Sequence, residues 1–234
     1  MRVTLLGLCC VASPCAASEA PRTPTRLSFY GFDGASDGIY SSFGFERATE
    51  AGLDARGAVI RAVFGSGLSR YRTGEDRALV LENTISARIL GGWRQAGSWG
   101  IATVFVGLGV EYRRLQTTEF AGLGPTGLKI GPAIAIDSWL TPWPKIAVQA
   151  QINFSTAHNA ASVRLAPGYE WTEGSHVGIE TIWSTHHESS RFKLGPFIAG
   201  GTPFGFDARL SGGLTRDPSG RSGFYASFAV WHRR

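Results

Sequence analysis

A short run of polar residues near the C-terminal third of the chain contains the residue types that perform acyl transfer. Residues 185–190 read Thr-His-His-Glu-Ser-Ser, and at the two-residue spacing of a strand His186, Glu188 and Ser190 share one face. A histidine can act as the general base for a serine hydroxyl while a carboxylate orients its ring. The simpler interpretation is the polar tip of a loop, where the same residue types are common.

The first 18 residues predict a secretory signal peptide. Arg2 precedes an apolar run over residues 3–11, and small residues end at Ser18. The apolar run is too short to cross a bilayer as a helix, which needs about 20 residues. We therefore assign residues 1–18 to a signal peptide, 19–26 to a short tether and 27–234 to the folded domain.

The rest of the chain lacks the spacing of a catalytic or cofactor site. The sequence has no phosphate-binding glycine loop, no paired carboxylates and no two-histidine metal spacing that stands out. All three cysteines, Cys9, Cys10 and Cys15, fall within the predicted signal peptide. The mature chain would then have no disulfide, no thiol nucleophile and no thiolate metal site. We predict a protein that is not an enzyme and that holds no cofactor or metal.

The composition favours a protein whose surface meets lipid. Charged residues make up 18% of the 234 residues, aromatics 12%, and 31 residues are glycine, whereas soluble domains are typically about 25% charged. The formal net charge of +5 could suggest nucleic acid, but Lys and Arg are spread along the chain without a basic cluster. We therefore expect lipid, and not nucleic acid, as a partner.

Residues 145–156 show the clearest alternation of apolar and polar side chains. Apolar residues from Ile146 to Phe154 occupy one parity, while Gln149, Gln151 and Asn153 occupy the other. Successive side chains of a strand point to opposite faces, so this segment predicts a strand with one apolar face. Similar segments cover residues 27–33, 39–47, 58–69, 79–93, 99–114, 127–140, 161–171, 177–186, 191–200, 205–215 and 223–232. An even number of such strands predicts an all-β fold, an antiparallel transmembrane β-barrel of about 12 strands after the signal peptide.

If the apolar parity faces lipid, the opposite parity lines the interior. The predicted lumen-facing residues are Arg61, Glu82, Arg88, Glu111, Lys129, Asp137, Gln149, Gln151, Asn153, Arg164, Glu170, Glu180, Lys193, Asp207 and Arg209. Their charges nearly balance, whereas a selective pore typically carries a ring of one sign. We expect opposite charges to pair and brace the interior, because an unpaired buried charge is costly. Contact with a translocated polymer or solute is the alternative role.

Several tryptophans lie near the ends of the predicted strands, as in the aromatic girdles of membrane barrels. They are Trp93, Trp99, Trp143, Trp171 and Trp231. A ring at the lipid boundary with its N–H in water suits such a position, although core aromatics of a soluble sandwich would show the same spacing. If both termini are periplasmic, residues 70–77, 115–125, 187–190 and 216–222 form the outer loops.

Short glycine-rich segments in a fixed order resemble the BcsS-type cellulose biosynthesis family of Gram-negative bacteria. They are residues 40–45, 57–61, 69–72, 129–132, 168–171, 194–196 and 207–210. The resemblance covers most of the mature chain. It implies an accessory to cellulose synthesis or secretion in the outer membrane, with cellulose or another β-glucan and components of the synthase system as partners. It implies no catalytic residues.

We therefore expect a non-enzymatic outer-membrane barrel of a Gram-negative bacterium that serves cellulose or exopolysaccharide biosynthesis or secretion. The alternatives are an outer-membrane lipid hydrolase or acyltransferase that uses His186 and Ser190, and a general porin for small solutes.

Overall fold

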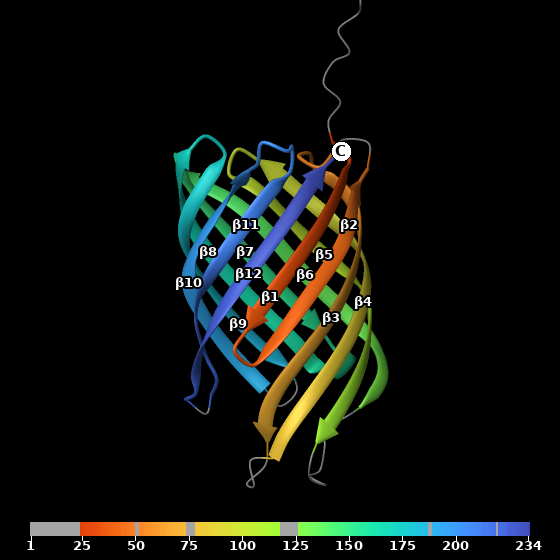
Figure 1. Ribbon diagram of the computed structural model, residues 1–234. Helices are drawn as coiled ribbons and strands as arrows, with labels where there is room; N and C mark the ends of the chain where they lie inside the picture. The colour runs from red at the N-terminus through yellow and green to blue at the C-terminus, as the bar shows by residue number, and fades with distance from the viewer. Residues whose placement is uncertain (1–23, 50–51, 74–77, 118–125, 187–188, 219) are drawn as a thin grey trace, which may run out of the picture.

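A closed antiparallel barrel of twelve strands makes up almost all of the computed structural model, which describes residues 24–49, 52–73, 78–117, 126–186, 189–218 and 220–234 (Figure 1). The strands are β1 Arg26–Ala35, β2 Gly38–Ala48, β3 Gly57–Thr73, β4 Ala78–Gly97, β5 Gly100–Thr117, β6 Gly127–Trp143, β7 Ile146–Ser155, β8 Ala160–Thr172, β9 Ser175–His186, β10 Ser189–Gly201, β11 Asp207–Arg216 and β12 Ser222–Arg233. The predicted fold class is confirmed, strand by strand. The predicted signal peptide lies outside the described residues.

The barrel closes where the first strand pairs with the last. β1 pairs antiparallel with β12 from Leu27 opposite Arg233 to Ala35 opposite Tyr225. The backbone N–H of Thr25 also donates to the carbonyl of Arg234 at 2.7 Å. Both ends of the described chain therefore lie at one end of the barrel, which we call the terminal end (Figure 1). The opposite end is called the loop end.

The barrel wall is taller on one side. β3 to β6 have 17 to 20 residues each, whereas β7 to β12 have 10 to 13. At about 3.3 Å per residue, a 20-residue strand is roughly 65 Å long, and Figure 1 shows β3, β4 and β5 projecting at the loop end. The loops predicted at 70–77 and 115–125 are shorter than expected, because β3 continues to Thr73 and β5 to Thr117.

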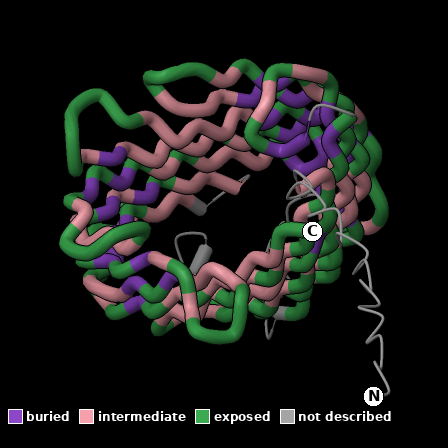
Figure 2. The backbone as a smooth tube through the Cα atoms, turned by 90° about the horizontal axis from the view of Figure 1, so that it is seen from above, coloured by how far each residue is buried: buried purple, intermediate pink, exposed green. Residues whose placement is uncertain are grey.

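The outer surface is apolar, and most buried charges lie on the opposite parity. Ile89 is 68% exposed and Ile130 66%, while Glu180 and Arg113 are almost fully buried. This arrangement is the reverse of a soluble protein, in which large aliphatic residues fill the core and charges face water. Seen along its axis, the wall is one strand thick, and exposed positions alternate with less exposed ones (Figure 2). The exposed apolar residues form the lipid-facing band of a transmembrane barrel.

The interior contains a small apolar core beside the charges. Leu53 from the β2–β3 connection packs there with Leu90 and Phe105, and Ala133 and Ala135 of β6 leave room for these larger side chains. One 3-10 helix, η1 Ala157–Asn159, lies in the connection between β7 and β8. No helix among the described residues is long and apolar enough to cross a membrane.

Four of the five predicted girdle tryptophans lie on the outside at the terminal end. Trp93 and Trp171 lie near the ends of β4 and β8, Trp99 lies between β4 and β5, and the three are 42% to 61% exposed. Trp143 is 67% exposed. The register of β6 and β7 shifts after Leu140, so that Trp143 is paired with the outward-facing Ile146. The shift therefore turns Trp143 to the outer face.

The prediction for Trp231 was wrong. Tyr225, Ser227, Ala229 and Trp231 share one parity of β12, and Tyr225 of that set is buried inside the barrel. Trp231 is paired with Asp207 of β11 in the register of that hairpin. Position near a strand end did not reveal which face the ring would take.

Candidate functional site in the barrel interior

The interior carries a network of ion pairs between strands that are not neighbours in the sheet. The pairs Arg61–Asp137 and His186–Glu111 join strands so far apart in the sheet that they must cross the lumen, so they identify the inward parity. The fifteen residues predicted to face the lumen all occupy this parity. The network gathers eight of them, with further residues that were not predicted, into three clusters.

The first group, the terminal cluster, consists of Glu46, Arg61, Arg94 and Asp137. Nε of Arg61 donates to Oε2 of Glu46 at 2.9 Å, and Arg94 pairs with the other oxygen of the same carboxylate. Arg61 also pairs with Asp137. Because β4 and β5 separate β3 from β6, the pair of Arg61 and Asp137 is a chord across part of the lumen. Two charges of each sign balance, and the Glu46 side chain has no exposed surface.

Apolar and backbone contacts hold the terminal cluster in place. The guanidinium of Arg61 lies over the Phe105 ring at 3.9 Å from its centroid, a cation–π contact. Arg94 donates through Nε to the Thr103 hydroxyl at 3.0 Å and through Nη1 to the Leu53 carbonyl at 2.5 Å. Arg94 therefore ties the β2–β3 connection to the wall.

The second group, the central cluster, surrounds Glu180 of β9. Nη2 of Arg209 lies 2.5 Å from Oε2 of Glu180, the Tyr225 hydroxyl donates to Oε1 at 3.2 Å, and Nε of Arg164 lies 3.7 Å from Oε2. Arg209 also donates to the side-chain oxygen of Gln149. The cluster thus links β7, β8, β9, β11 and β12 around one buried carboxylate.

The third group, the outer cluster, lies toward the loop end. Nη2 of Arg113 lies 2.8 Å from Oε2 of Glu82 and donates to the Tyr71 hydroxyl at 2.9 Å. Nε2 of His186 lies 2.7 Å from Oε1 of Glu111, and its Nδ1 lies 3.6 Å from Oε1 of Glu82. His186 comes from β9, whereas both carboxylates come from β4 and β5, so this contact crosses the lumen.

The helix η1 folds inward and packs against the outer cluster. His158 is 1% exposed, its Nε2 lies 3.2 Å from the Gly127 carbonyl, and its ring stacks at 6.5 Å from the ring of His186. His158 and Asn159 have positive φ of 55° and 51°, which lets the connection turn sharply. A Cβ on Gly131 would meet the Thr156 hydroxyl at 2.1 Å, so glycine permits this close approach.

The acyl-transfer arrangement predicted for residues 186–190 does not form. His186 ends β9 and Ser190 lies in β10, where it pairs with Thr185 and not with His186. The Ser190 hydroxyl donates to the Thr185 hydroxyl at 3.1 Å, on the parity opposite to that of His186. The prediction that the two residues share a face was wrong, because a hairpin turn interrupts the strand. Glu188 lies outside the described residues.

The remaining predicted lumen residues make smaller contacts. Lys193 pairs with Asp33 of β1, Nδ2 of Asn153 lies 3.4 Å from the Ser162 hydroxyl, and Asp207 lies 3.9 Å from Arg233. Gln151 is paired with Asp137 in the strand register, and Glu170 accepts a hydrogen bond from the Gly174 N–H. The Arg88 side chain lies beside Gly109, and Lys129 is exposed. The described residues contain no group of three or more His, Cys, Asp or Glu suited to a metal ion.

Sequence reasoning missed several residues that complete the clusters. Arg94 and Arg113 lie on the same parity as Arg88 and Glu111, which were selected in the same strands, so a stricter use of strand parity would have found them. Glu46 lies in β2, from which no residue was selected, although it alternates with the apolar Phe43 and Phe45. His158 gave no such signal, because it lies outside any strand.

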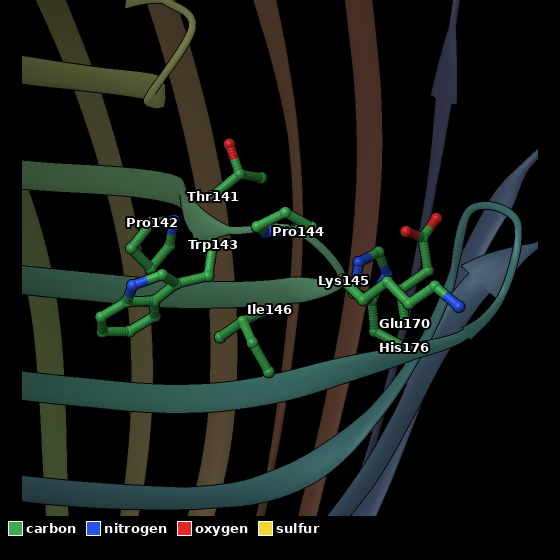
Figure 3. Close-up of a pocket in the computed structure, with 8 residues that line it drawn as sticks. All are labelled: Thr141, Pro142, Trp143, Pro144, Lys145, Ile146, Glu170 and His176. Atoms are coloured by element: carbon green, nitrogen blue, oxygen red, sulfur yellow. The ribbon is translucent and has the colours of Figure 1, made fainter.

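Two open recesses lie at the terminal end. One, of about 350 Å³, lies at the β6–β7 hairpin and is lined by residues 141–146 with Glu170 and His176 (Figure 3). The other, of about 540 Å³, lies between residues 54–56 and the ends of β4, β5 and β6, where Trp139 lines it. In Figure 3 the side chains of Lys145, Glu170 and His176 lie together, away from the Trp143 ring.

Comparison with known proteins links the chain to one family and one kind of fold. The sequence profile described as cellulose biosynthesis protein BcsS matches residues 27–234. The translocator domain of the autotransporter NalP from Neisseria meningitidis has a TM-score of 0.55 and 13% identity, covering 91% of this chain and 89% of that one.

Two further solved structures are less similar. The KdgM porin has a TM-score of 0.49 and 5% identity, covering 88% of this chain and 98% of that one. The transport unit of the autotransporter AIDA-I from Escherichia coli has a TM-score of 0.49 and 9% identity, covering 92% of each chain. A comparison with curated protein sequences finds no match.

Proposed function

Because this chain belongs to the cellulose biosynthesis protein BcsS family, we propose that it is a non-enzymatic outer-membrane barrel, an accessory in cellulose or exopolysaccharide biosynthesis or secretion. The family match over residues 27–234 is the observation that carries the proposal, since it spans the whole barrel. The partners are outer-membrane lipid, cellulose or another β-glucan, and components of the cellulose synthase system.

Three features support the proposed location in the outer membrane of a Gram-negative bacterium. The outer face is apolar, the barrel is closed, and its terminal end carries Trp93, Trp99, Trp143 and Trp171 at the boundary. Closed barrels satisfy every backbone hydrogen bond within lipid, which open sheets cannot do. The predicted signal peptide would deliver the chain to the periplasm, so the terminal end is placed there.

The interior supports a braced barrel. Each cluster joins strands that are not neighbours, and its opposite charges pair with one another. A wide porin would instead leave charged side chains projecting into a water-filled channel. The separation of His186 from Ser190 removes the geometric basis for the hydrolase alternative. We therefore place the accessory role in binding and guiding partners at the barrel ends.

Membrane fractionation tests the location. The chain should pellet with outer membranes, resist extraction by carbonate and migrate faster when unheated than when heated on SDS gels, as folded barrels do. Recovery as a soluble periplasmic protein would contradict the membrane proposal.

A deletion strain tests the role. We expect secreted cellulose, measured as glucose released by cellulase, to fall and to recover on complementation with the full chain. Normal cellulose output in the deletion strain would leave the barrel and its family but would contradict the accessory role.

A further inference from the structure

The two recesses at the terminal end meet at one aromatic contact. Trp139 lines the larger recess and His176 lines the smaller one, and their rings make an edge-to-face contact with centroids 5.1 Å apart. The two recesses therefore form one lined surface at the mouth, which we call the vestibule. It has Trp139 in the middle, Asp54 and Arg56 on one side, and Lys145 and Glu170 on the other.

Trp139 is held at the entrance to the lumen. It has the same inward parity as Asp137, is half-buried, and lies opposite Ile101 of β5 and Gln149 of β7 in the register. Gln149 begins the neutral row that continues inward with Gln151 and Asn153. The aromatic ring thus stands where the vestibule meets the uncharged strip of the wall.

The other wall of the vestibule is a fixed strap. Leu53 is buried, its N–H donates to the Pro24 carbonyl at 2.7 Å, and its carbonyl accepts from Arg94 at 2.5 Å. Asp54 reaches Arg233 of β12 at 3.1 Å. These contacts hold residues 52–56 across the mouth beside the larger recess, so the vestibule is a preformed surface.

We propose that the vestibule binds a β-1,4-glucan chain on the periplasmic side, with one sugar ring stacked on Trp139 and hydroxyl groups bonded to Glu170, Asp54 and Arg56. This inference rests on the proposed function and specifies its partner site. A β-1,4-glucan is a flat ribbon whose sugar rings have apolar C–H faces and whose hydroxyls point outward at the edges. An aromatic ring flanked by carboxylate and guanidinium groups matches both surfaces.

The lining favours a neutral polar chain over the other ligand classes. Asp54 and Glu170 would oppose a phosphate or another anion, while Arg56 and Lys145 balance their charge. An apolar ligand would displace water from these charged groups without replacing its hydrogen bonds. Carbohydrate, with hydroxyls that both donate and accept, satisfies groups of either sign.

Titration of the purified barrel in detergent with cellohexaose tests the site, followed by calorimetry and by tryptophan fluorescence. Trp139→Ala should weaken binding at least tenfold, whereas Trp139→Phe should keep most of it by retaining an aromatic face. Trp171→Ala is the matched control, because that ring lies on the outer face at the same end of the barrel and lines neither recess. Maltohexaose, whose α-linkages make a curved chain, should bind much more weakly.

Heat-modifiable migration on SDS gels shows that each variant is folded before it is titrated. If the wild-type barrel does not bind cellohexaose, or if folded Trp139→Ala binds it as wild type does, the vestibule proposal is overturned. The deletion strain distinguishes failure of the vestibule site from failure of the proposed accessory function. Reduced cellulose in the deletion strain, with full recovery by Trp139→Ala, would leave the accessory role standing and reject the site.

Discussion

At the scale of single residues, the interior is stabilised by carboxylates that each serve more than one cation. Glu46 accepts from Arg61 with one oxygen and from Arg94 with the other, and its side chain is fully buried. A buried carboxylate costs several kcal/mol of desolvation, which only well-placed partners offset. Removing the carboxylate would leave both guanidinium groups facing a partly dry interior.

Glu46→Gln should therefore lower the free energy of unfolding by about 3–5 kcal/mol, the range for breaking a buried ion pair. The measurement is urea unfolding of the barrel in lipid vesicles, followed by tryptophan fluorescence. Asp54→Asn is the control, because its pair with Arg233 is about half exposed and such pairs contribute at most about 1 kcal/mol. Equal losses in the two variants would show that burial does not set the strength of these pairs.

His158 gives the outer cluster a dependence on pH. Burial lowers the pKa of His158, and Lys129 and Arg113 lower it further, while the Gly127 carbonyl and Glu111 act in the opposite direction. The docked helix therefore favours the neutral ring. As the pH falls through about 6.5, the usual value for histidine, the undocked state gains a proton that the docked state resists. Docking of η1 should weaken as the pH is lowered.

Hydrogen exchange at residues 157–159, corrected for the intrinsic pH dependence of exchange, measures this effect. We expect protection at pH 7.5 and less protection at pH 5.5. His158→Gln, which cannot titrate, should remove the difference, whereas His232→Gln at the other end of the barrel should keep it. A wild-type difference that survives in His158→Gln would assign the effect to another group.

At the scale of elements, β7 shows how much of a strand the alternation of apolar and polar side chains can predict. The predicted strand at 145–156 is Ile146–Ser155 in the structure, with Ile152 and Phe154 exposed on the outside and Gln151 on the inside. Strand periodicity fixes the face of every residue once one is placed. Both the strand and its faces could therefore be predicted from the sequence.

Ile152→Arg should impair assembly far more than Gln151→Arg. Ile152 is 41% exposed on the lipid-facing side, where an arginine near the membrane midplane costs about 2–4 kcal/mol. Gln151 faces inward and is paired in the register with Asp137, which would accept the new charge. The measurement is the folded fraction in outer membranes, judged by heat-modifiable migration. Equal assembly of the two variants would contradict the assigned faces.

Connections between strands limited the prediction from sequence. A hairpin turn separates His186 from Ser190, a register shift turns Trp143 outward, and η1 carries His158 into the lumen. Each depends on backbone geometry at a turn or bulge, which side-chain alternation does not encode. The twelve strands were predictable because the two faces of each strand meet different surroundings, so apolar and polar side chains alternate along its whole length.

At the scale of the whole molecule, the three clusters make contacts between strands at different heights of the barrel. The terminal cluster joins β3 to β6 near the terminal end, the central cluster joins β7 to β12, and the outer cluster joins β9 to β4 and β5 near the loop end. The clusters thus brace both halves of the wall. Which strands would meet across the lumen could not be predicted, because it depends on barrel closure and strand tilt.

A braced interior predicts a low ionic conductance for the barrel in a planar lipid bilayer. His186→Ala removes the outer bridge and Arg61→Ala removes the chord at the terminal end, but each alone leaves the other contact across the lumen in place. Conductances in series are limited by the narrowest segment, so the double variant should conduct several-fold more than wild type, while each single variant changes little. Trp143→Ala, on the outer face, should not change conductance. A wild-type barrel that already conducts like a wide porin, or a double variant no different from wild type, would show that these side chains do not close the lumen.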